Sequence, residues 1–433
     1  MKIWIKNGRV LNPATKTDEI LDILTEDSYI KQIGKELSSD ETADADRIID
    51  ASGCYVMPGL IDMHVHLRDP GLTYKETMET GTKAATMGGF TTILAMANTS
   101  PVIDDAEKLS AVYEHAKKCS PIQVLQVGSV TKGLEGTELT DAAALKEAGA
   151  PALSEDGKTV MNASLFRQAL SQAASLDMPV LDHCEDVSLK GKGALNQGAV
   201  SERLNVEGIT NAVEDIIIAR DILLAKETGA RLHICHCSTE DSMKIIRAAK
   251  QDGLSVTSEV CPHHFTLTDA DIIPGDSNYK MAPPLRSRKD VNALIEGLKD
   301  GTIDVISSDH APHAAHEKTS DIASAAFGIV GLETSVPLTI SELVRPGYLT
   351  PLQMTEKMSW NPAKILGIEK GNLAVGKDAD ITIIDPETEY VIDIETFASM
   401  GRNTPFHGRK VCGKVMYTIC GGEICKKVRP AAQ

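Results

Sequence analysis

The chain has 433 residues, of which 42% are hydrophobic and 24% are charged, and its formal net charge is −17. This length suits one barrel-sized domain plus a smaller one, and the composition is that of a globular protein. The acidity argues against nucleic acid or an anionic membrane as a partner. No apolar run approaches membrane-spanning length, and nine cysteines without a signal peptide indicate reduced thiols in a cytoplasm.

The two ends of the chain have a similar character. Residues 1–55 read as short strands and turns, with a hairpin at Asn7-Gly8. The segment 371–433 also contains apolar runs of strand length and lacks long helical periodicity. We expect these segments to meet in one small composite β-sandwich domain, which leaves residues 56–370 as a second domain.

In the middle of the chain, apolar segments of strand length alternate with helical ones. The strand candidates cover residues 61–66, 91–96, 122–127, 151–153, 178–183, 231–236, 254–260 and 303–308. The helical candidates include residues 76–87, 141–148, 162–176, 214–228, 239–251 and 289–299. Eight alternating units over about 300 residues predict an α/β fold of the (β/α)8 TIM-barrel type, with the site at the C-terminal ends of the strands. The structural rival is a doubly wound open sheet, which more naturally carries a glycine-rich turn after its first strand.

The first of these strands ends in Asp62-Met63-His64-Val65-His66-Leu67-Arg68. Side chains at i and i+2 of a strand point to the same face, so His64 and His66 present two imidazoles side by side. Imidazole is the commonest protein ligand for zinc-like metals. Two histidines hydrogen-bonded in a core are the alternative, and Arg68 could equally form a salt bridge with Asp69.

Four more strand ends carry His or Asp: Asp156 on the fourth, His183 on the fifth, His236 on the sixth and Asp309 on the eighth. In the sixth strand, parity predicts that His236 points into the barrel mouth while Cys235 and Cys237 face the helices. A zinc-thiolate site is therefore the weaker interpretation. His310 points away from Asp309 by the same parity, which indicates a structural role.

Four histidines and two aspartates can hold two divalent metals if one carboxylate bridges them. Two metals roughly 3.5–4 Å apart can share a water and produce hydroxide near neutral pH. Asp309 could bind one metal, take the proton and deliver it to a leaving nitrogen. The chemistry that this pattern predicts is hydrolysis of an amide-like bond.

The chain resembles the amidohydrolase superfamily and, within it, the bacterial type I dihydroorotases. The most specific matches are the stretch 62–71, which contains both histidines of the first strand, and the stretch 307–318, which begins Ser-Ser-Asp-His-Ala-Pro-His. Residues 96–99, 154–157, 233–239 and 283–286 support the match, which spans essentially the whole length. Both terminal segments resemble the family's composite β-sandwich.

The resemblance implies two Zn²⁺ per subunit, bridged by Asp156 and a hydroxide, with a second site that can be partly occupied. It assigns His64, His66 and Asp309 to the first metal and His183 and His236 to the second. Lys158 is the alternative bridge. The resemblance assigns substrate contacts to a further set of residues: His66, Arg68, Asn98, Ala282, His313, Phe327 and Gly328. Ala282 stands where many relatives have a substrate-binding Asn.

The implied reaction is the reversible hydrolysis of L-dihydroorotate to N-carbamoyl-L-aspartate in pyrimidine biosynthesis, with Asp309 as general base and acid. Alternatives are a hydantoinase, dihydropyrimidinase or allantoinase, or a non-catalytic scaffold for aspartate transcarbamoylase. A homodimer, and association with that transcarbamoylase, are further expectations. The segment 312–326 is expected to form a mobile loop over the site.

Overall fold

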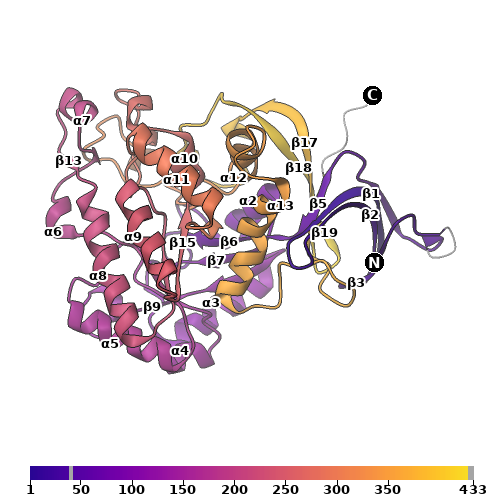
Figure 1. Cartoon of the computed structure of the whole chain (residues 1–433), viewed down its shortest axis with the longest axis horizontal. Helices are drawn as coiled ribbons and strands as arrows, with labels where there is room; N and C mark the ends of the chain where they lie inside the picture. Colours follow the sequence, from indigo (N-terminus) through magenta and orange to yellow (C-terminus); the bar gives the residue numbers. More distant parts are fainter. Residues whose placement is uncertain (39–41, 428–433) are drawn as a thin grey trace.

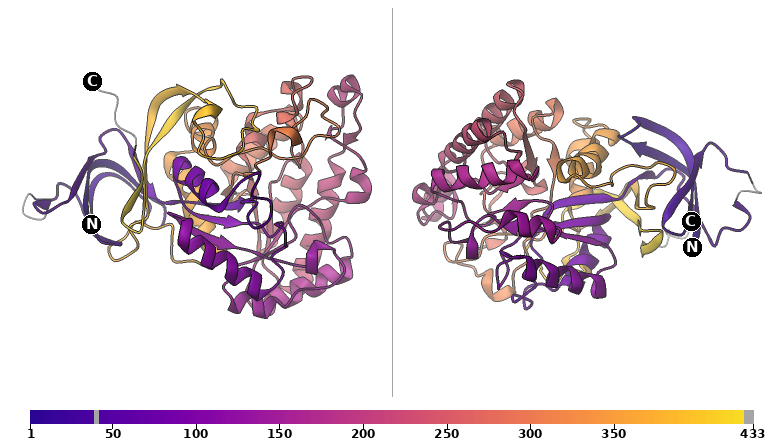
Figure 2. Two further views of the ribbon diagram at one scale, coloured as in Figure 1. Left: turned by 180° about the vertical axis from the view of Figure 1, so that it is seen from behind. Right: turned by 90° about the horizontal axis from the view of Figure 1, so that it is seen from below.

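The computed structural model describes residues 1–38 and 42–427. Its two parts lie side by side in Figure 1: a barrel surrounded by helices, and a strongly curved sheet that contains the N-terminus. The two further views of Figure 2 show the same separation, with the sheet projecting from one side of the barrel. No helix in the described part of the chain is both long and apolar enough to cross a lipid bilayer.

The barrel is a closed parallel sheet. Its strands are β6 (Leu60–Val65), β7 (Phe90–Ala95), β8 (Gln123–Gln126), β9 (Gly128–Ser129), β10 (Leu153–Ser154), β11 (Val180–Asp182), β14 (Leu232–Ile234), β15 (Val256–Val260) and β16 (Val305–Ile306). Every neighbouring pair is parallel, and β8 and β9 act as one strand interrupted at Val127. The circle closes between β6 and the end of β16, where the amide of His66 donates to the carbonyl of His310 at 2.8 Å. The predicted eight-stranded barrel is confirmed, and β10, β11, β14, β15 and β16 are shorter than the predicted segments.

Helices follow the strands and cover the outside of the barrel (Figure 1). Their bounds are α2 (Met78–Gly88), α3 (Ala106–Cys119), α4 (Ala142–Glu147), α5 (Ala163–Ser175), α6 (Val187–Lys190), α7 (Ala199–Leu204), α8 (Ala212–Thr228), α9 (Glu240–Gln251), α10 (Pro262–Thr266), α11 (Arg288–Asp300), α12 (Ser335–Thr339), α13 (Pro351–Thr355) and α14 (Asn361–Leu366). Thr239 and Asp141 cap α9 and α4 with their side chains, because each accepts a hydrogen bond from a backbone amide of the first turn. A short pair of strands, β12 (Leu195–Asn196) and β13 (Gly208–Ile209), stands outside the barrel.

The ends of the chain share one sheet, as the sequence predicts. It contains β1 (Lys2–Asn12), β2 (Thr17–Glu26), β3 (Tyr29–Gly34), β4 (Arg47–Asp50), β5 (Tyr55–Pro58), β17 (Ile381–Val391), β18 (Lys410–Cys420) and β19 (Glu423–Lys427). N- and C-terminal strands join where β5 pairs with β17. The expected hairpin at Asn7-Gly8 is wrong: β1 runs through it, and Asn7, at a φ of 61°, forms a bulge instead.

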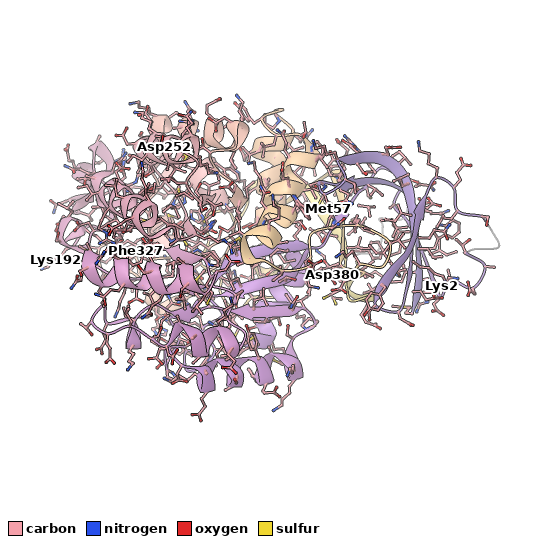
Figure 3. All side chains as sticks on the ribbon, turned by 60° about the horizontal axis from the view of Figure 1, so that its bottom comes forward. Lys2, Met57, Lys192, Asp252, Phe327 and Asp380 are labelled. Carbon is pink, nitrogen blue, oxygen red and sulfur yellow. The ribbon has the colours of Figure 1, made fainter. Side chains whose placement is uncertain are left out.

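The domain boundaries at residues 55 and 371 stay a prediction. The sheet continues through Pro58, three residues beyond the first of them. Residues 39–41 and 428–433, which the prediction assigned to the β domain, lie outside the described residues. Met57 and Asp380, labelled in Figure 3, lie where the sheet meets the barrel, and the amide of Gly59 donates to the carbonyl of Asp380 at 2.8 Å.

Each part has its own apolar core. Buried side chains such as Phe90 and Phe166 fill the space between the barrel strands and their helices. Ile3, Ile5 and Ile381 belong to a separate cluster under the terminal sheet. Burial of these side chains stabilises each part by roughly 25 cal/mol per Å² of apolar surface removed from water.

Candidate metal centre and active site

The six predicted metal ligands meet at the C-terminal end of the barrel, around the carboxylate of Asp156. Asp156 Oδ1 lies 3.1 Å from His64 Nε2 and 3.5 Å from both His183 Nδ1 and His236 Nε2. Its other oxygen lies 3.4 Å from His66 Nε2. One carboxylate thus faces four imidazoles contributed by three different strand ends.

Asp309 completes one side of this cluster. Its Oδ1 lies 3.1 Å from His66 Nε2 and 3.7 Å from His64 Nε2. On the other side, His183 Nδ1 and His236 Nε2 are 2.9 Å apart. The carboxylate of Asp156 stands between a group of two histidines and an aspartate and a group of two histidines, which is the arrangement expected of a bridging ligand.

The cluster fits metal ions better than it fits hydrogen bonding among its own members. His64 Nε2 and Asp156 Oδ1 are fully buried and have no hydrogen-bond partner among the described residues. Unpartnered buried polar atoms are rare because each loses its hydration without compensation. Imidazole nitrogens and carboxylate oxygens are ligands typical of zinc and similar divalent cations.

Electrostatics at the cluster favour a cation. Burial raises the pKa of Asp156, but the charge of His64 and the close approach of His183 and His236 outweigh it and hold that pKa well below its usual range. Burial lowers the pKa of His183, but Asp156 and Glu185 together raise it to about 10. The carboxylates that favour a proton on these rings would equally favour a metal ion in its place.

Glu259, on β15, orients the first histidine and escaped the sequence analysis. Its Oε1 lies 2.7 Å from His64 Nδ1, which leaves Nε2 of that ring to face Asp156. Its Oε2 lies 3.2 Å from His233 Nε2. A carboxylate on the far nitrogen of a metal-ligating histidine fixes the ring and its tautomer. The signal in the sequence is one acid within a strand whose other residues are uncharged.

The prediction for Cys235 is wrong in one respect. His233 and Cys235 lie inside the barrel beside His64 and Glu259, rather than facing the helices. The strand ends at Ile234, and His236 has a φ of 33°. The alternation of side chains along a strand therefore does not predict the orientation of Cys235 and His236. His236 still reaches the mouth as predicted.

Left-handed backbone recurs at this site. Arg68, His236 and Asp309 have φ values of 62°, 33° and 46°. Non-glycine residues avoid this region, and they cluster at active sites where the surrounding structure holds them in place. The conformations turn each of these side chains toward the mouth just beyond the end of its strand.

The candidate catalytic pocket, a cavity of about 200 Å³ above the cluster, is lined by every predicted site residue except His64, which is buried beneath it. Asn98, Ala282, Phe327 and Gly328 are therefore at its walls. Glu185 and Lys190 also line the pocket and were not predicted. Lys158 is exposed and does not line it.

The basic end of the pocket is built around Arg68. Its Nε donates to the carbonyl of Pro312 at 3.2 Å, and its Nη2 lies 3.4 Å from His313 Nε2. The alternative salt bridge with Asp69 does not form, because Asp69 instead contacts His115 at 3.2 Å. A buried guanidinium beside a histidine, with no carboxylate of the chain against it among the described residues, suits an anionic group of a substrate.

His313 and Asn98 extend this end. Burial, and then the charge of Arg68, lower the pKa of His313 to about 3, so the free pocket holds this imidazole neutral. His313 Nε2 lies 2.8 Å from the carbonyl of Phe327. Asn98 Oδ1 lies 2.9 Å from His66 Nδ1, which joins the amide to the cluster.

Two further histidines, His310 and His316, lie outside the cluster. His310 is buried, with its Nε2 3.3 Å from Glu76, as the parity argument predicts. His316 stacks on Tyr74 at the surface. The loop 312–326 is anchored by Lys318, whose Nζ donates to three backbone carbonyls. Its predicted mobility stays a prediction.

Comparison with known proteins places the chain. Residues 53–242 match the family model described as Dihydro-orotase-like. The dihydroorotase of Acetivibrio thermocellus is 48% identical over 97% of this chain and 98% of its own length. The dihydroorotase of Pelotomaculum thermopropionicum is 50% identical over 99% of both chains.

Among solved structures, the L-hydantoinase (dihydropyrimidinase) of Arthrobacter aurescens superposes with a TM-score of 0.87 at 28% identity, over 98% of this chain and 96% of that one. A dihydropyrimidinase from Brevibacillus agri gives 0.84 at 26% identity, over 99% of this chain and 95% of that one. The fold is thus shared with hydantoinases and dihydropyrimidinases, whereas the sequence identity is higher with the dihydroorotases.

Proposed function

This chain belongs to the dihydroorotase family of metal-dependent cyclic-amide hydrolases, and on that premise we propose how its residues interconvert L-dihydroorotate and N-carbamoyl-L-aspartate. The observation that carries the proposal is one pocket with two ends. Asp156, His66, His183 and His236 form its floor, with His64 beneath them. Arg68 and His313 form a basic end. A ring amide and a ring carboxylate are the two features of dihydroorotate that these ends would receive.

The metal would be held by six side chains. His64, His66 and Asp309 would ligate one ion, His183 and His236 the other, and Asp156 both. We propose Zn²⁺, since histidine nitrogens and carboxylates in this number suit it. When bound, the ions supply a water made acidic enough to attack at neutral pH, and they polarise the ring carbonyl.

Asp309 is the proposed proton carrier. Its carboxylate lies at the pocket surface, against His66. Burial raises its pKa, but the hydrogen bond of His66 and the charge of His64 lower that pKa below its usual range. Asp309 would accept the proton of the attacking water and pass it to the leaving ring nitrogen; in ring closure the proton moves in the opposite direction.

Arg68, Asn98 and His313 would orient the substrate by its carboxylate. Arg68 offers a planar fork of donors, which matches a carboxylate in two bonds. Ala282 and the backbone of Phe327 and Gly328 would form the opposing wall. Ala282 has no side-chain donor, so the backbone beside it would define the shape of the pocket there.

The test is a side-by-side assay of the purified protein with its metal content measured. We expect cyclisation of carbamoyl aspartate and hydrolysis of dihydroorotate, with two divalent ions per chain. Hydantoin and allantoin lack the carboxylate that Arg68 would hold, so they should be turned over poorly. Turnover of these two without activity on carbamoyl aspartate would overturn the proposal in favour of a hydantoinase or allantoinase.

We also propose a homodimer. Apolar side chains are exposed on neighbouring outer elements of the barrel: Met161, Val187 and Leu189 on one side, Ile216 and Leu223 on α8. The helix α8 is apolar on its inner face as well, where Ile217 and Ile218 are buried. Apolar side chains gathered on one exposed surface often mark a protein–protein contact. Light scattering on wild type and Leu223→Lys would test this, with a monomeric wild type counting against it.

A transcarbamoylase partner and a cytoplasmic location stay proposals. All nine cysteines are unpaired, and the described chain places each of them; free thiols suit a reducing compartment. The aspartate transcarbamoylase reaction makes carbamoyl aspartate, so contact between the two enzymes would shorten the path of this intermediate. Co-sedimentation of the two purified proteins would test the association.

A further inference from the structure

A second cavity shares His313 with the catalytic pocket. It has a volume of about 420 Å³, against about 200 Å³ for the pocket. Lys75, Lys318 and Arg402 line it, together with Tyr74 and Asn278, and no carboxylate lies among its lining residues. We call it the basic cavity. In a chain with a net charge of −17, a concave surface lined by three cations is unusual and indicates an anionic ligand.

Two of the three cations have no counter-ion among residues 1–38 and 42–427. Lys318 Nζ donates to the carbonyls of Lys280, Ala326 and Gly328 at 2.9–3.1 Å and contacts no carboxylate. Burial, and then the charge of Lys280, lower the pKa of Lys318 to about 7. A half-buried cation such as Lys318 that lacks a counter-ion is stabilised when an anion from outside binds beside it.

Arg402 is arranged in the same way. Its Nη1 donates to the carbonyl of Gly401 at 2.9 Å and also to that of Ser399, and its Nη2 reaches the carbonyl of Phe397 at 3.3 Å. These bonds fix the side chain but leave its charge uncompensated by any carboxylate of the described chain. A guanidinium held in place by backbone is preorganised for an oxyanion, because little side-chain freedom is lost on binding.

The third cation, Lys75, connects the basic cavity to the catalytic pocket. Its Nζ lies 2.8 Å from Glu317, and the same carboxylate accepts from Tyr74 at 3.1 Å and lies 3.3 Å from His313 Nδ1. The single carboxylate of Glu317 does not balance the charges of Lys75, Lys318 and Arg402, so the cavity is positive. An anion beside Lys75 would compete with Glu317 for the ammonium group of Lys75. A shift of Glu317 would alter its contact with His313, which also lines the catalytic pocket.

We propose that the basic cavity is a second, non-catalytic binding site for a compact phosphate-bearing anion, occupied at the same time as the catalytic pocket. A volume of about 420 Å³ is within the range of small-ligand sites. Lysine and arginine are the side chains that bind phosphate oxygens best, and the amide of Asn278 adds a donor. This inference goes beyond the proposed function and does not depend on which cyclic amide is hydrolysed.

The first experiment measures binding of labelled inorganic phosphate to the metal-loaded protein by equilibrium dialysis. We expect one phosphate per chain in addition to any that the metals hold. Arg402→Met and Lys75→Met should each weaken this binding at least tenfold. Lys117→Met, which removes an exposed cation paired with Glu114 on α3, is the matched control and should leave it unchanged.

The folding of the variants is checked separately, by thermal unfolding and by metal content. Arg402 anchors three backbone carbonyls, so its variant could be destabilised. Lys75 makes a single ion pair, and its variant carries the test if Arg402→Met does not fold. Phosphate binding that is the same in wild type and in a folded Lys75→Met protein would overturn the proposal.

The second experiment separates the basic cavity from the catalytic pocket. Orotate, the planar oxidised form of the proposed substrate ring, is added at increasing concentration during the phosphate titration. For two sites coupled through His313, the apparent Kd of phosphate must reach a plateau. A Kd that rises in proportion to orotate without limit would show that phosphate sits in the catalytic pocket, and the proposal would be wrong. Failure of wild type to cyclise carbamoyl aspartate would instead count against the proposed function alone.

Discussion

The barrel mouth and the terminal sheet bury different kinds of side chain. At the mouth, Asp156, Asp309 and four histidines are nearly or fully buried and face one another within 3.7 Å. Under the terminal sheet, the buried residues are mostly isoleucines, and an ion pair such as Arg9 with Asp18 lies at the surface. Burying titratable groups lowers stability, so the mouth is organised for chemistry and the sheet for folding.

The backbone differs between the two regions in the same sense. Left-handed residues at the mouth, such as His236 and Asp309, aim side chains at one point. In the terminal sheet, Asn7 adopts a similar φ only to form a bulge in β1. Local strain in the mouth is therefore tied to function, whereas in the sheet it serves strand geometry. Substitutions in the two regions should separate activity from stability.

The largest effect is expected for Asp309→Ala. This variant removes a proposed metal ligand and the proton carrier together, so kcat for carbamoyl aspartate cyclisation should fall by about 10⁴ or more. Steady-state kinetics with metal analysis would measure it. Asp18→Ala, which breaks the surface pair with Arg9, is the control and should keep full activity. Comparable losses of kcat in both variants would contradict the assignment of catalysis to the barrel mouth.

Ile5→Ala tests the opposite half of the comparison. Ile5 is fully buried in the core of the terminal sheet, and truncating such a side chain destabilises a protein by about 2–5 kcal/mol. We expect a lower Tm with kcat and metal content per folded molecule unchanged. A loss of metal without a change in Tm would mean that the sheet supports the site directly.

Glu259→Gln tests the positioning of His64. The amide keeps the size of the side chain but removes the charge that orients the ring, so metal affinity should fall by about 10–100-fold. Chelator competition measures this, and added metal should restore most of the activity. Glu389→Gln, at an exposed pair with Arg345, is the matched control. Unchanged metal affinity in Glu259→Gln would remove this residue from the site.

The smallest effect concerns Lys426 of β19. Burial is the main cause that lowers its pKa from 10.5 to about 8. Between these values the unfolded chain binds more protons than the folded one, so this residue makes stability rise with pH over that window. Lys426→Met should be more stable than wild type by about 1–2 kcal/mol at pH 7, net of one lost hydrogen bond, and the gain should shrink toward pH 10.5. A difference in unfolding free energy between Lys426→Met and wild type that stays constant from pH 7 to pH 10.5 would refute this.

The sequence alone determined the architecture and the identity of the main side chains. Alternating apolar segments of strand and helix length predicted the barrel, and matching character at both ends predicted the shared sheet. His-x-His on the first strand, with Asp309 on the last, predicted the cluster. These features are local: strand periodicity fixes which side chains share a face, and parallel strands bring their C-terminal ends to one edge.

Only the tertiary structure decided the features that depend on several segments at once. The pairing of His64 with Glu259 joins β6 to β15, and the basic cavity joins residues near 75, 318 and 402. Strand alternation misplaced Cys235, and an Asn-Gly pair suggested a turn where β1 continues as a bulge. Local patterns carry the periodicity of the backbone, whereas barrel closure and left-handed residues at the strand ends determine which distant side chains meet.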